Sequence, residues 1–306
     1  MSSKNNILIV GGTGFIGYHL AKKTLKKGWR VTSISSKPPK KKRYLKKVKY
    51  IVCDITKKKL LERNINENYS YVVNLGGYVD HSNKKKTFES HYIGCKNLAQ
   101  FFLKRRIISF IQMGSSIEYG KSKSPQKESN KCNPKLIQST YGKAKLLASK
   151  YLIELFEKKN FPSTVLRLYL AYGPKQDLNR FLPIVINGCI KDKKFPCSEG
   201  HQLRDFVHVE DVIRAILKAL KNKNARGQII NIGSGKPQRI KKVIEQVKKI
   251  SKGGRPQFGK IKFRRDEILN LYPDITKAKN KIKWKPLISF RKGIKSTIKY
   301  YNGSTI

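Results

Sequence analysis

A tyrosine and a lysine stand four residues apart, at Tyr141 and Lys145, and two serines, Ser115 and Ser116, follow an apolar segment upstream. Residues four apart lie on the same face of a helix, so the ammonium can lie near the phenol and lower its pKa from about 10 towards neutral. A serine hydroxyl at the end of a strand can then help to bind a substrate oxygen. This set predicts proton transfer to or from a bound oxygen, although a Tyr-x-x-x-Lys pair alone is more often surface decoration.

A glycine-rich turn lies near the beginning of the chain, with Gly11, Gly14 and Gly17 at three-residue spacing. It follows a short apolar run at residues 7–10 and precedes a helical pattern that continues to about residue 27. Glycines here permit a tight turn, a close approach of the backbone to a pyrophosphate and close packing of the helix on the strand. The helix N-terminus adds free N–H groups and positive potential. A glycine triplet alone is weak evidence, but between a strand and a helix it predicts dinucleotide binding.

The elements that must position these groups alternate along the first half of the chain. Helices are expected at residues 84–103 and 136–158, between and after apolar runs. The apolar runs predict strands at residues 7–10, 30–35, 50–52, 71–75, 107–113 and 164–168. This alternation is typical of βαβ units, so the sequence predicts an α/β fold with a Rossmann-type, doubly wound parallel sheet.

The regular alternation loosens after Gly173 and Pro174, where shorter segments and more turn residues follow. We therefore expect residues 1–173 to form an NAD(P)-binding Rossmann domain, and residues 174–306 to form mainly a smaller substrate-binding lobe. Residues 209–220 have an apolar helical face, and residues 228–232 predict a strand. A segment at about 205–232 is expected to return to the main sheet, which makes the C-terminal lobe discontinuous.

The charge of the chain is strongly positive. Its 306 residues contain 68 lysines and arginines against 19 aspartates and glutamates, a formal charge of +49. Hydrophobic residues at 39% are too many for a disordered chain, so the chain is expected to fold. Lysine runs are spread throughout, which favours solvated surface charge over a nucleic-acid face, where basic residues concentrate on one element. We expect no specific nucleic-acid partner; a surface that binds nucleic acid or an anionic membrane is the alternative.

Five cysteines are scattered without a C-x-x-C pair, which argues against a disulfide framework or a zinc site, so we expect no metal. A reducing compartment fits them best. The first residues lack the apolar stretch of a signal peptide, and no run of about 18 apolar residues occurs. The sequence therefore predicts a soluble, cytoplasmic protein with no membrane partner.

Further motifs follow in order along nearly the whole chain. They occur at residues 53–55, 74–77, 165–167, 172–174, 204–208, 210–211, 231–235 and 274–278, with Trp284 and Pro286 near the end. With the glycine turn and the set of Ser115, Tyr141 and Lys145, they make the chain resemble the extended short-chain dehydrogenase/reductase family, in its NAD(P)-dependent nucleotide-sugar epimerase, dehydratase and reductase branch. The resemblance implies an enzyme of nucleotide-sugar metabolism and cell-surface polysaccharide biosynthesis. It also implies a homodimer in which the helices at 84–103 and 136–158 pair across the interface.

The resemblance implies a role for each matching position. Tyr141 would be the proton donor or acceptor, Lys145 its electrostatic partner and a ribose ligand, and Ser115 the companion hydroxyl. The residues implied around the cofactor, besides Tyr141 and Lys145, are Gly11, Gly14, Phe15, Ile16, Gly17, Asp54, Ile55, Leu75, Gly76 and Gly77. The residues implied near the nucleoside-diphosphate sugar are His81, Ser115, Ser116, Asn179, Arg180, Arg204 and Arg264.

Two positions depart from the family pattern. His91 stands where relatives carry an asparagine before the fifth strand, which would alter a structural hydrogen bond behind the active site. Leu170 stands where many relatives carry an asparagine, which would remove a contact to the diphosphate.

Particular positions separate the reactions of this branch. The 4,6-dehydratases follow the strand-end hydroxyl with an acid pair that eliminates water. Here Ser115 is followed by Ser116 and Ile117, and Glu118 is out of register by one. Dehydration is therefore not expected.

The end of the second strand bears on the choice of cofactor. The 4-epimerases usually end this strand with an acid that binds the ribose 2′-hydroxyl. This chain has Ser35, Ser36 and Lys37, so we expect Ser36 and Lys37 to bind cofactor and NADP to be favoured over NAD. The expected activity is reduction of the 4-keto group of a nucleoside-diphosphate 4-keto-6-deoxyhexose. An NAD-dependent 4-epimerase is the alternative, and a non-catalytic dinucleotide-fold binding protein is a remote one.

Overall fold

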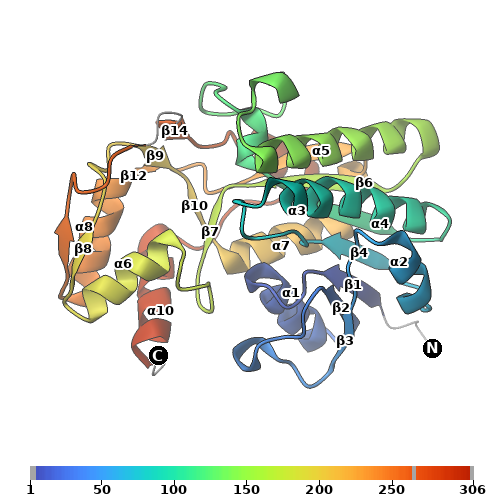
Figure 1. Cartoon of the computed structure of the whole chain (residues 1–306), viewed down its shortest axis with the longest axis horizontal. Coiled ribbons are helices and arrows are strands. Elements are labelled where there is room, and N and C mark those ends of the chain that lie inside the picture. Colours follow the sequence, from blue (N-terminus) through green and yellow to red (C-terminus); the bar gives the residue numbers. More distant parts are fainter. Residues whose placement is uncertain (1–4, 264–266, 304–306) are drawn as a thin grey trace.

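The computed structural model describes residues 5–263 and 267–303, and its centre is a sheet of seven parallel strands (Figure 1). The strands are β1 (Asn6–Val10), β2 (Arg30–Ser35), β3 (Val48–Val52), β4 (Tyr71–Asn74), β5 (Ser109–Ser115), β6 (Ser163–Leu168) and β11 (Gln228–Ile232). Their spatial order is β11-β6-β5-β4-β1-β2-β3, and every neighbouring pair is parallel. The predicted α/β fold with a parallel sheet is confirmed.

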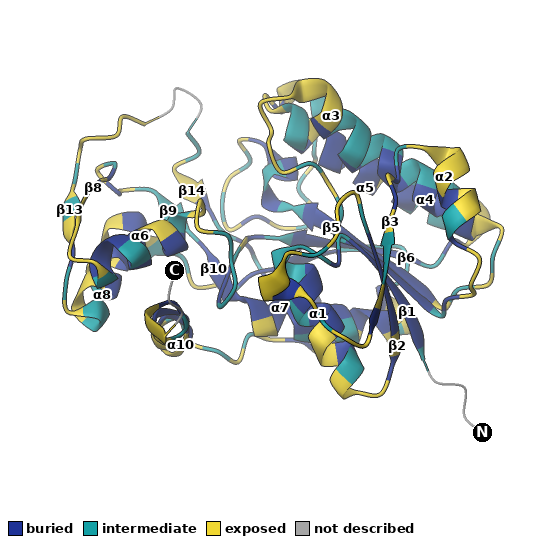
Figure 2. Cartoon of the chain, turned by 60° about the horizontal axis from the view of Figure 1, so that its bottom comes forward, coloured by how far each residue is buried: buried dark blue, intermediate teal, exposed yellow. Residues whose placement is uncertain are grey.

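Helices cover both faces of this sheet. Successive residues of a strand point to opposite faces, so Ile7 and Ile9 of β1 join one buried cluster, and Leu8 and Val10 join another. The helices whose buried residues join the first cluster are α1 (Phe15–Lys26), α7 (Val209–Leu220) and α9 (Thr276–Ile282). Those of the second cluster are α2 (Lys58–Asn64), α4 (Gly94–Leu103) and α5 (Thr140–Lys159). The sheet is therefore doubly wound, and Figure 2 shows its strands buried between exposed outer helix faces.

A third buried cluster lies to one side of the sheet (Figure 1). It is built mainly by α6 (Phe181–Ile190), α8 (Ile240–Ser251) and α10 (Phe290–Gly303), with β8 (Lys194–Pro196) paired to β13 (Arg255–Gln257). The remaining strands are short: β7 (Leu170–Tyr172), β9 (Leu203–Arg204), β10 (Phe206–His208), β12 (Gln238–Arg239) and β14 (Asn270–Leu271). Tyr172 of β7 and Phe206 of β10 belong to the third cluster. The chain crosses to this side after β6, returns for α7 and β11, and returns again for α9.

Two predicted helices differ from the observed ones. The helix expected at 84–103 consists of α3 (Lys84–Phe88), a π-helical turn (Glu89–Ile93) and α4. The helix expected from residue 136 begins at Thr140, because Ser139 caps it by accepting a hydrogen bond from the Gly142 N–H at 3.1 Å. Single-turn 3-10 helices occupy residues 41–43, 116–119, 134–136 and 223–225.

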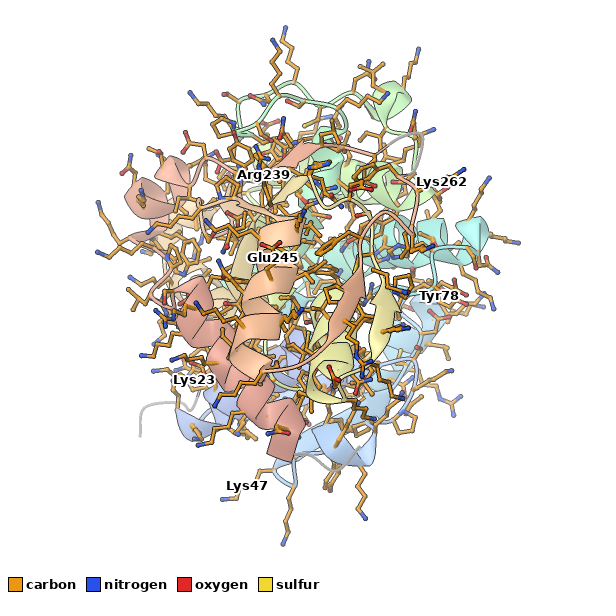
Figure 3. All side chains as sticks on the ribbon, turned by 90° about the vertical axis from the view of Figure 1, so that its left-hand side faces the viewer. Lys23, Lys47, Tyr78, Arg239, Glu245 and Lys262 are labelled. Carbon is orange, nitrogen blue, oxygen red and sulfur yellow. The ribbon has the colours of Figure 1, made fainter. Side chains whose placement is uncertain are left out.

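Basic side chains project from many parts of the surface. Figure 3 shows nitrogen-tipped side chains around the whole outline of the molecule. Its labelled lysines, Lys23, Lys47 and Lys262, are all exposed and lie on α1, on the β2–β3 connection and near β13. None of the helices in residues 5–263 and 267–303 has the length and apolar character needed to cross a membrane.

Candidate active site at the carboxyl ends of the strands

The glycine turn packs tightly against neighbouring backbone. Gly11 has a φ of +77°, and a Cβ added there would lie 2.9 Å from the N of Gly76, beyond the end of β4. A Cβ at Gly17 would lie 2.3 Å from the carbonyl oxygen of Gly11. Helix α1 begins at Phe15, after Gly14, with backbone N–H groups free for an anion. The turn, the strand ends and the helix N-terminus therefore fit the pyrophosphate of a dinucleotide.

The residues expected around the adenosine lie at the ends of β2 and β3. The Oγ of Ser35 accepts a hydrogen bond from the Thr13 N–H at 3.4 Å, which connects the end of β2 to the glycine turn. Ser36 and Lys37 follow and are exposed. Asp54 is also exposed and accepts the Thr56 N–H at 2.9 Å, whereas Ile55 is buried.

Four residues surround Tyr141. The ring of His81 stacks on it, with centroids 4.2 Å apart and an interplanar angle of 15°. His91 meets it edge-on at 4.9 Å. The phenol is hydrogen-bonded with Ser115, and the Nζ of Lys145 lies 5.9 Å from the ring centroid. The structure therefore brings Ser115, Tyr141 and Lys145 together and places His81 against the same tyrosine.

The pKa of Tyr141 is raised in this arrangement and not lowered as expected. Burial raises the pKa of the Tyr141 phenol, and its hydrogen bond with Ser115 offsets this only in part. Lys145 is itself buried, which lowers its pKa to about 8, and its Nζ donates to the carbonyl of Met113 at 2.7 Å. Desolvation disfavours the charged form of both groups, so the phenol stays protonated at neutral pH.

His91 lies beside the site and not only behind it. Its Nε2 is 3.2 Å from the carbonyl oxygen of Tyr78, and its ring covers Gly77, where an added Cβ would lie 1.8 Å from the ring. Burial and the charge of Lys145 lower the pKa of His91 to about 2, so the ring is neutral. The sequence identified His91 only as a departure from the family pattern; nothing local indicated its contact with Tyr141.

In the sequence, Glu118 is distinguished only as an out-of-register acid. Its carboxylate is fully buried, accepts the Ser115 N–H at 2.7 Å and pairs with Arg167 at 2.8 Å. Both oxygens are engaged, since Ser149 also donates to Oε2 at 2.8 Å. Glu118 is therefore not free to transfer protons at the site, which agrees with the expected lack of dehydration chemistry.

The residues expected near the sugar nucleotide are more dispersed. Ser116 is buried beside Ser115, and Asn179 and Arg180 are exposed just before α6. The charge of Arg180 acts on both His81 and Tyr141, lowering the pKa of each. Arg204 on β9 forms an ion pair with Glu267. Arg264 lies outside the described residues.

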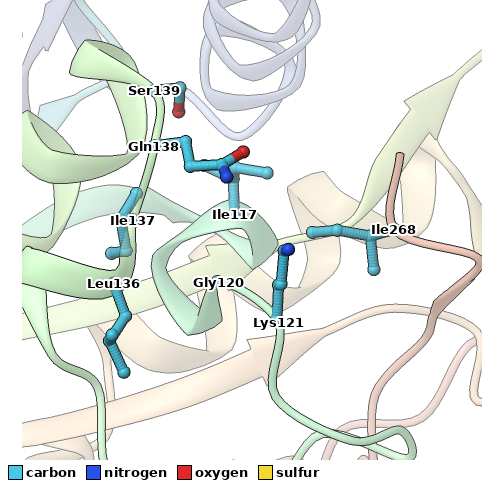
Figure 4. Close-up of a pocket in the computed structure, with 8 residues that line it drawn as sticks. All are labelled: Ile117, Gly120, Lys121, Leu136, Ile137, Gln138, Ser139 and Ile268. Atoms are coloured by element: carbon cyan, nitrogen blue, oxygen red, sulfur yellow. The ribbon is translucent and has the colours of Figure 1, made fainter. Parts of the chain in front are cut away.

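A pocket adjoins the beginning of α5 (Figure 4). Its walls come from Ile117 and residues 120–121, from residues 136–139 and from Ile268. Ile117 and Ile137 also pack against Gly142, the neighbour of Tyr141. In Figure 4 the side chains of Lys121 and Ile268 point toward one another at one end of this pocket. The pocket thus lies next to the turn that carries Tyr141.

Known proteins resemble this chain over almost its full length. A decarboxylase from Bacillus cytotoxicus, UDP-N-acetyl-alpha-D-glucosaminuronate decarboxylase, is 26% identical and matches 97% of this chain and 98% of its own. The dTDP-4-dehydro-6-deoxyglucose reductase of Escherichia coli is 28% identical over 97% of both chains. The solved structure of a UDP-glucose 4-epimerase with UDP-glucose, from Thermotoga maritima, superposes with a TM-score of 0.87 at 25% identity, covering 97% of this chain and 98% of the other.

The sequence model described as the NAD dependent epimerase/dehydratase family matches residues 7–233. This range contains the glycine turn, the end of β2 and the set of Ser115, Tyr141 and Lys145. The chain therefore belongs to the NAD dependent epimerase/dehydratase family of enzymes.

Proposed function

We propose that this enzyme reduces the 4-keto group of a nucleoside-diphosphate 4-keto-6-deoxyhexose and uses NADPH to do so. The observation that carries the proposal is the end of β2. Ser35 occupies that end, hydrogen-bonded to the glycine turn, and Ser36 and Lys37 follow it as exposed residues. A carboxylate there would favour the 2′-hydroxyl of NAD, whereas hydroxyls and an ammonium favour a 2′-phosphate through charge-assisted hydrogen bonds.

The state of Tyr141 supports reduction. A reduced nicotinamide bound along residues 75–77 would supply the hydride. Tyr141, whose raised pKa keeps the phenol protonated, donates its proton to the substrate oxygen as that oxygen becomes an alkoxide. Ser115 donates a hydrogen bond to the same oxygen, and the Lys145 ammonium stabilises the tyrosinate that remains.

Arginines on the substrate side fit a diphosphate. Arg180 is exposed next to α6, and its charge reaches His81 and Tyr141. Arg204 is positioned by its pairing with Glu267. A planar guanidinium binds phosphate oxygens in pairs, so these two residues are proposed to hold the nucleoside diphosphate.

A 4-epimerase is the second candidate, because the solved UDP-glucose 4-epimerase is similar over 97% of this chain. Epimerisation starts with a tyrosine that removes a proton, and it returns the hydride to the same sugar carbon. It therefore needs an oxidised cofactor that stays bound and produces no net change in nicotinamide absorbance.

The test measures cofactor retention and consumption. The purified enzyme should carry no tightly held NAD, and it should oxidise NADPH stoichiometrically when given a nucleotide-linked 4-keto-6-deoxyhexose. NADPH should bind about ten- to a hundredfold more tightly than NADH. Lys37→Ala should remove most of this preference, whereas Lys47→Ala, an exposed lysine on the same β2–β3 connection, should not.

The opposite result would favour the epimerase. NAD found at one per subunit, with no NADPH oxidation on any 4-keto sugar, would end the reductase proposal. Equal affinities of the wild-type enzyme for NADPH and NADH would show that the end of β2 does not select the 2′-phosphate, and the reductase proposal would lose its support.

A further inference from the structure

The carboxylate of Glu118 connects three elements that meet at the active site. It accepts the N–H of Ser115 at the end of β5, the hydroxyl of Ser149 on α5 and the Nε of Arg167 on β6, all within 2.8 Å. Glu118 and Ser149 are completely buried, and Arg167 is 2% exposed. The catalytic tyrosine and lysine lie on the same helix as Ser149. One side chain thus fixes Ser115 relative to the helix that carries Tyr141.

A capping box explains only part of this arrangement. Ser115 and Glu118 do cap the 3-10 helix at residues 116–119 reciprocally. A cap of this kind needs neither a partner from β6 nor complete burial. The strand backbone is also adapted to the carboxylate, because a Cβ on Gly114 would lie 2.6 Å from its Oε1. Gly114 therefore allows the carboxylate to lie directly against the end of β5.

Stability alone is a weak reason to keep this ion pair. Removing two charges from water costs about as much as their attraction returns, and apolar residues of similar volume often serve stability equally well. The pair of Glu118 and Arg167 is nevertheless almost wholly removed from solvent. A function for the negative charge itself gives a more specific reason.

The charge of Glu118 acts on Lys145. The titratable groups that face Lys145 come from every element around it and are His81, His91, Cys95, Glu118 and Tyr141. Burial raises the pKa of Cys95 to about 12 and raises that of Tyr141, and both histidines have lowered pKa values. Glu118, whose carboxylate pairs with Arg167, opposes the burial that lowers the pKa of Lys145.

We infer that Glu118 is a positioning residue of this active site, which holds Ser115 in place and keeps the Lys145 ammonium charged. The inference rests on the proposed function, because it assigns Glu118 to the same site. Arg167 balances the charge of Glu118 and so lets the carboxylate be buried.

The experiment separates charge, reach and folding. Glu118→Gln keeps the shape of the side chain and removes its charge, and Glu118→Asp keeps the charge but shortens the reach to Ser115. Because Glu118→Gln leaves Arg167 buried without a counter-charge, the double variant Glu118→Gln/Arg167→Gln provides a neutral pair. Glu128→Gln is the matched control, since Glu128 also accepts a backbone N–H, that of Asn231, at 2.8 Å.

The first readout is the affinity for NADH between pH 6 and 9.5, measured by fluorescence. NADH has no 2′-phosphate to titrate in this range. Wild-type affinity should weaken through about pH 8 as Lys145 loses its proton. In Glu118→Gln and in the double variant, the pH at which NADH affinity weakens should be about one unit lower, because a charge opposite to that of Lys145 has been removed. In Glu118→Asp and Glu128→Gln, the affinity for NADH should weaken at the same pH as in the wild type.

The second readout is turnover of the 4-keto sugar with NADPH. Glu118→Gln and Glu118→Asp should each lower kcat by about a hundredfold, because Ser115 is no longer held in place. KM should change less than about threefold.

Each result decides one of the two claims. Wild-type kcat in Glu118→Asp, or an unchanged pH dependence of NADH affinity in Glu118→Gln, overturns the inference and leaves the proposed function intact. If Glu118→Gln does not fold, the double variant takes its place. If neither variant folds, Glu118 is a purely structural residue and the inference fails. If the wild-type enzyme binds no dinucleotide, the proposed function fails and the inference fails with it.

Discussion

Two regions of the molecule use a fully buried carboxylate to hold backbone N–H groups. At the end of β5, Glu118 accepts from Ser115 and pairs with Arg167. At the beginning of α7, Asp211 accepts from Leu287 and Ile288 at 3.0–3.2 Å. Both side chains are 0% exposed.

The difference lies in what each carboxylate holds. Asp211 fastens the connection that follows Trp284 and leads to α10, and its own carbonyl accepts the Trp284 indole N–H at 3.0 Å. Its cation, Arg214, is 29% exposed and can turn to solvent. Glu118 instead holds a residue that contacts Tyr141, and its cation is buried. We therefore propose that the same local device serves the reaction in one region and the fold in the other.

The largest effect should be a loss of turnover on substitution of Tyr141, which contacts Ser115 next to the Glu118 region. Tyr141→Phe removes the proposed proton donor and keeps the ring that stacks on His81. Turnover should fall by at least about a hundredfold, while NADPH affinity changes little. Steady-state rates and cofactor titration measure the two quantities separately. Wild-type turnover in this variant would remove Tyr141 from the mechanism.

The second largest effect should be a loss of stability on substitution of Asp211. Asp211→Ala removes the charged acceptor of the Leu287 and Ile288 N–H groups, so the free energy of unfolding should fall by about 2–4 kcal/mol. The rate per folded molecule should stay near that of the wild type. Urea denaturation and turnover at low temperature test both parts. A loss of turnover without a loss of stability would contradict the division between the regions.

The sheet was predictable because its signals are local. Apolar runs such as residues 7–10 and 228–232 gave the strands, and residues 209–220 gave α7 with its observed bounds. The π-helical turn at Glu89–Ile93 has no comparable local signal, and the Ser139 cap was overlooked, so the bounds of two helices were wrong.

The candidate site was predictable only where motifs are contiguous or belong to the family pattern. Ser115, Tyr141 and Lys145 were expected together and do lie together. The partner of Glu118 is 49 residues away on another strand, and the stacking of His81 joins a loop after β4 to α5. Such contacts depend on the packing of distant segments, which the spacing of residues in the sequence does not determine.

A smaller effect should appear in the pH dependence of stability. Unfolded His91 titrates near 6.5, but its pKa in the folded protein is about 2. Between these values the unfolded state binds one more proton, so stability falls as the pH falls, by about 1.4 kcal/mol per pH unit well below 6.5. His91→Asn should reduce the slope between pH 5.5 and 4.5 by this amount, and the exposed His201→Asn is the control. Equal slopes in wild type and His91→Asn would mean that His91 is not buried as a neutral ring.

The smallest effect should come from a carboxylate that is exposed. Glu154 pairs with Lys158 at 2.7 Å on α5, but their side chains are 56% and 69% exposed. Water screens such a pair, and ordering two long side chains offsets its attraction, so Glu154→Gln should not change Tm at about 0.15 M salt. At low salt a small loss should appear, because the substitution raises a formal charge that is already +49 and repulsion among the lysines is then less screened. Thermal unfolding at both salt concentrations measures this, and a loss that persists at high salt would show that burial is not what distinguishes Glu118 and Asp211.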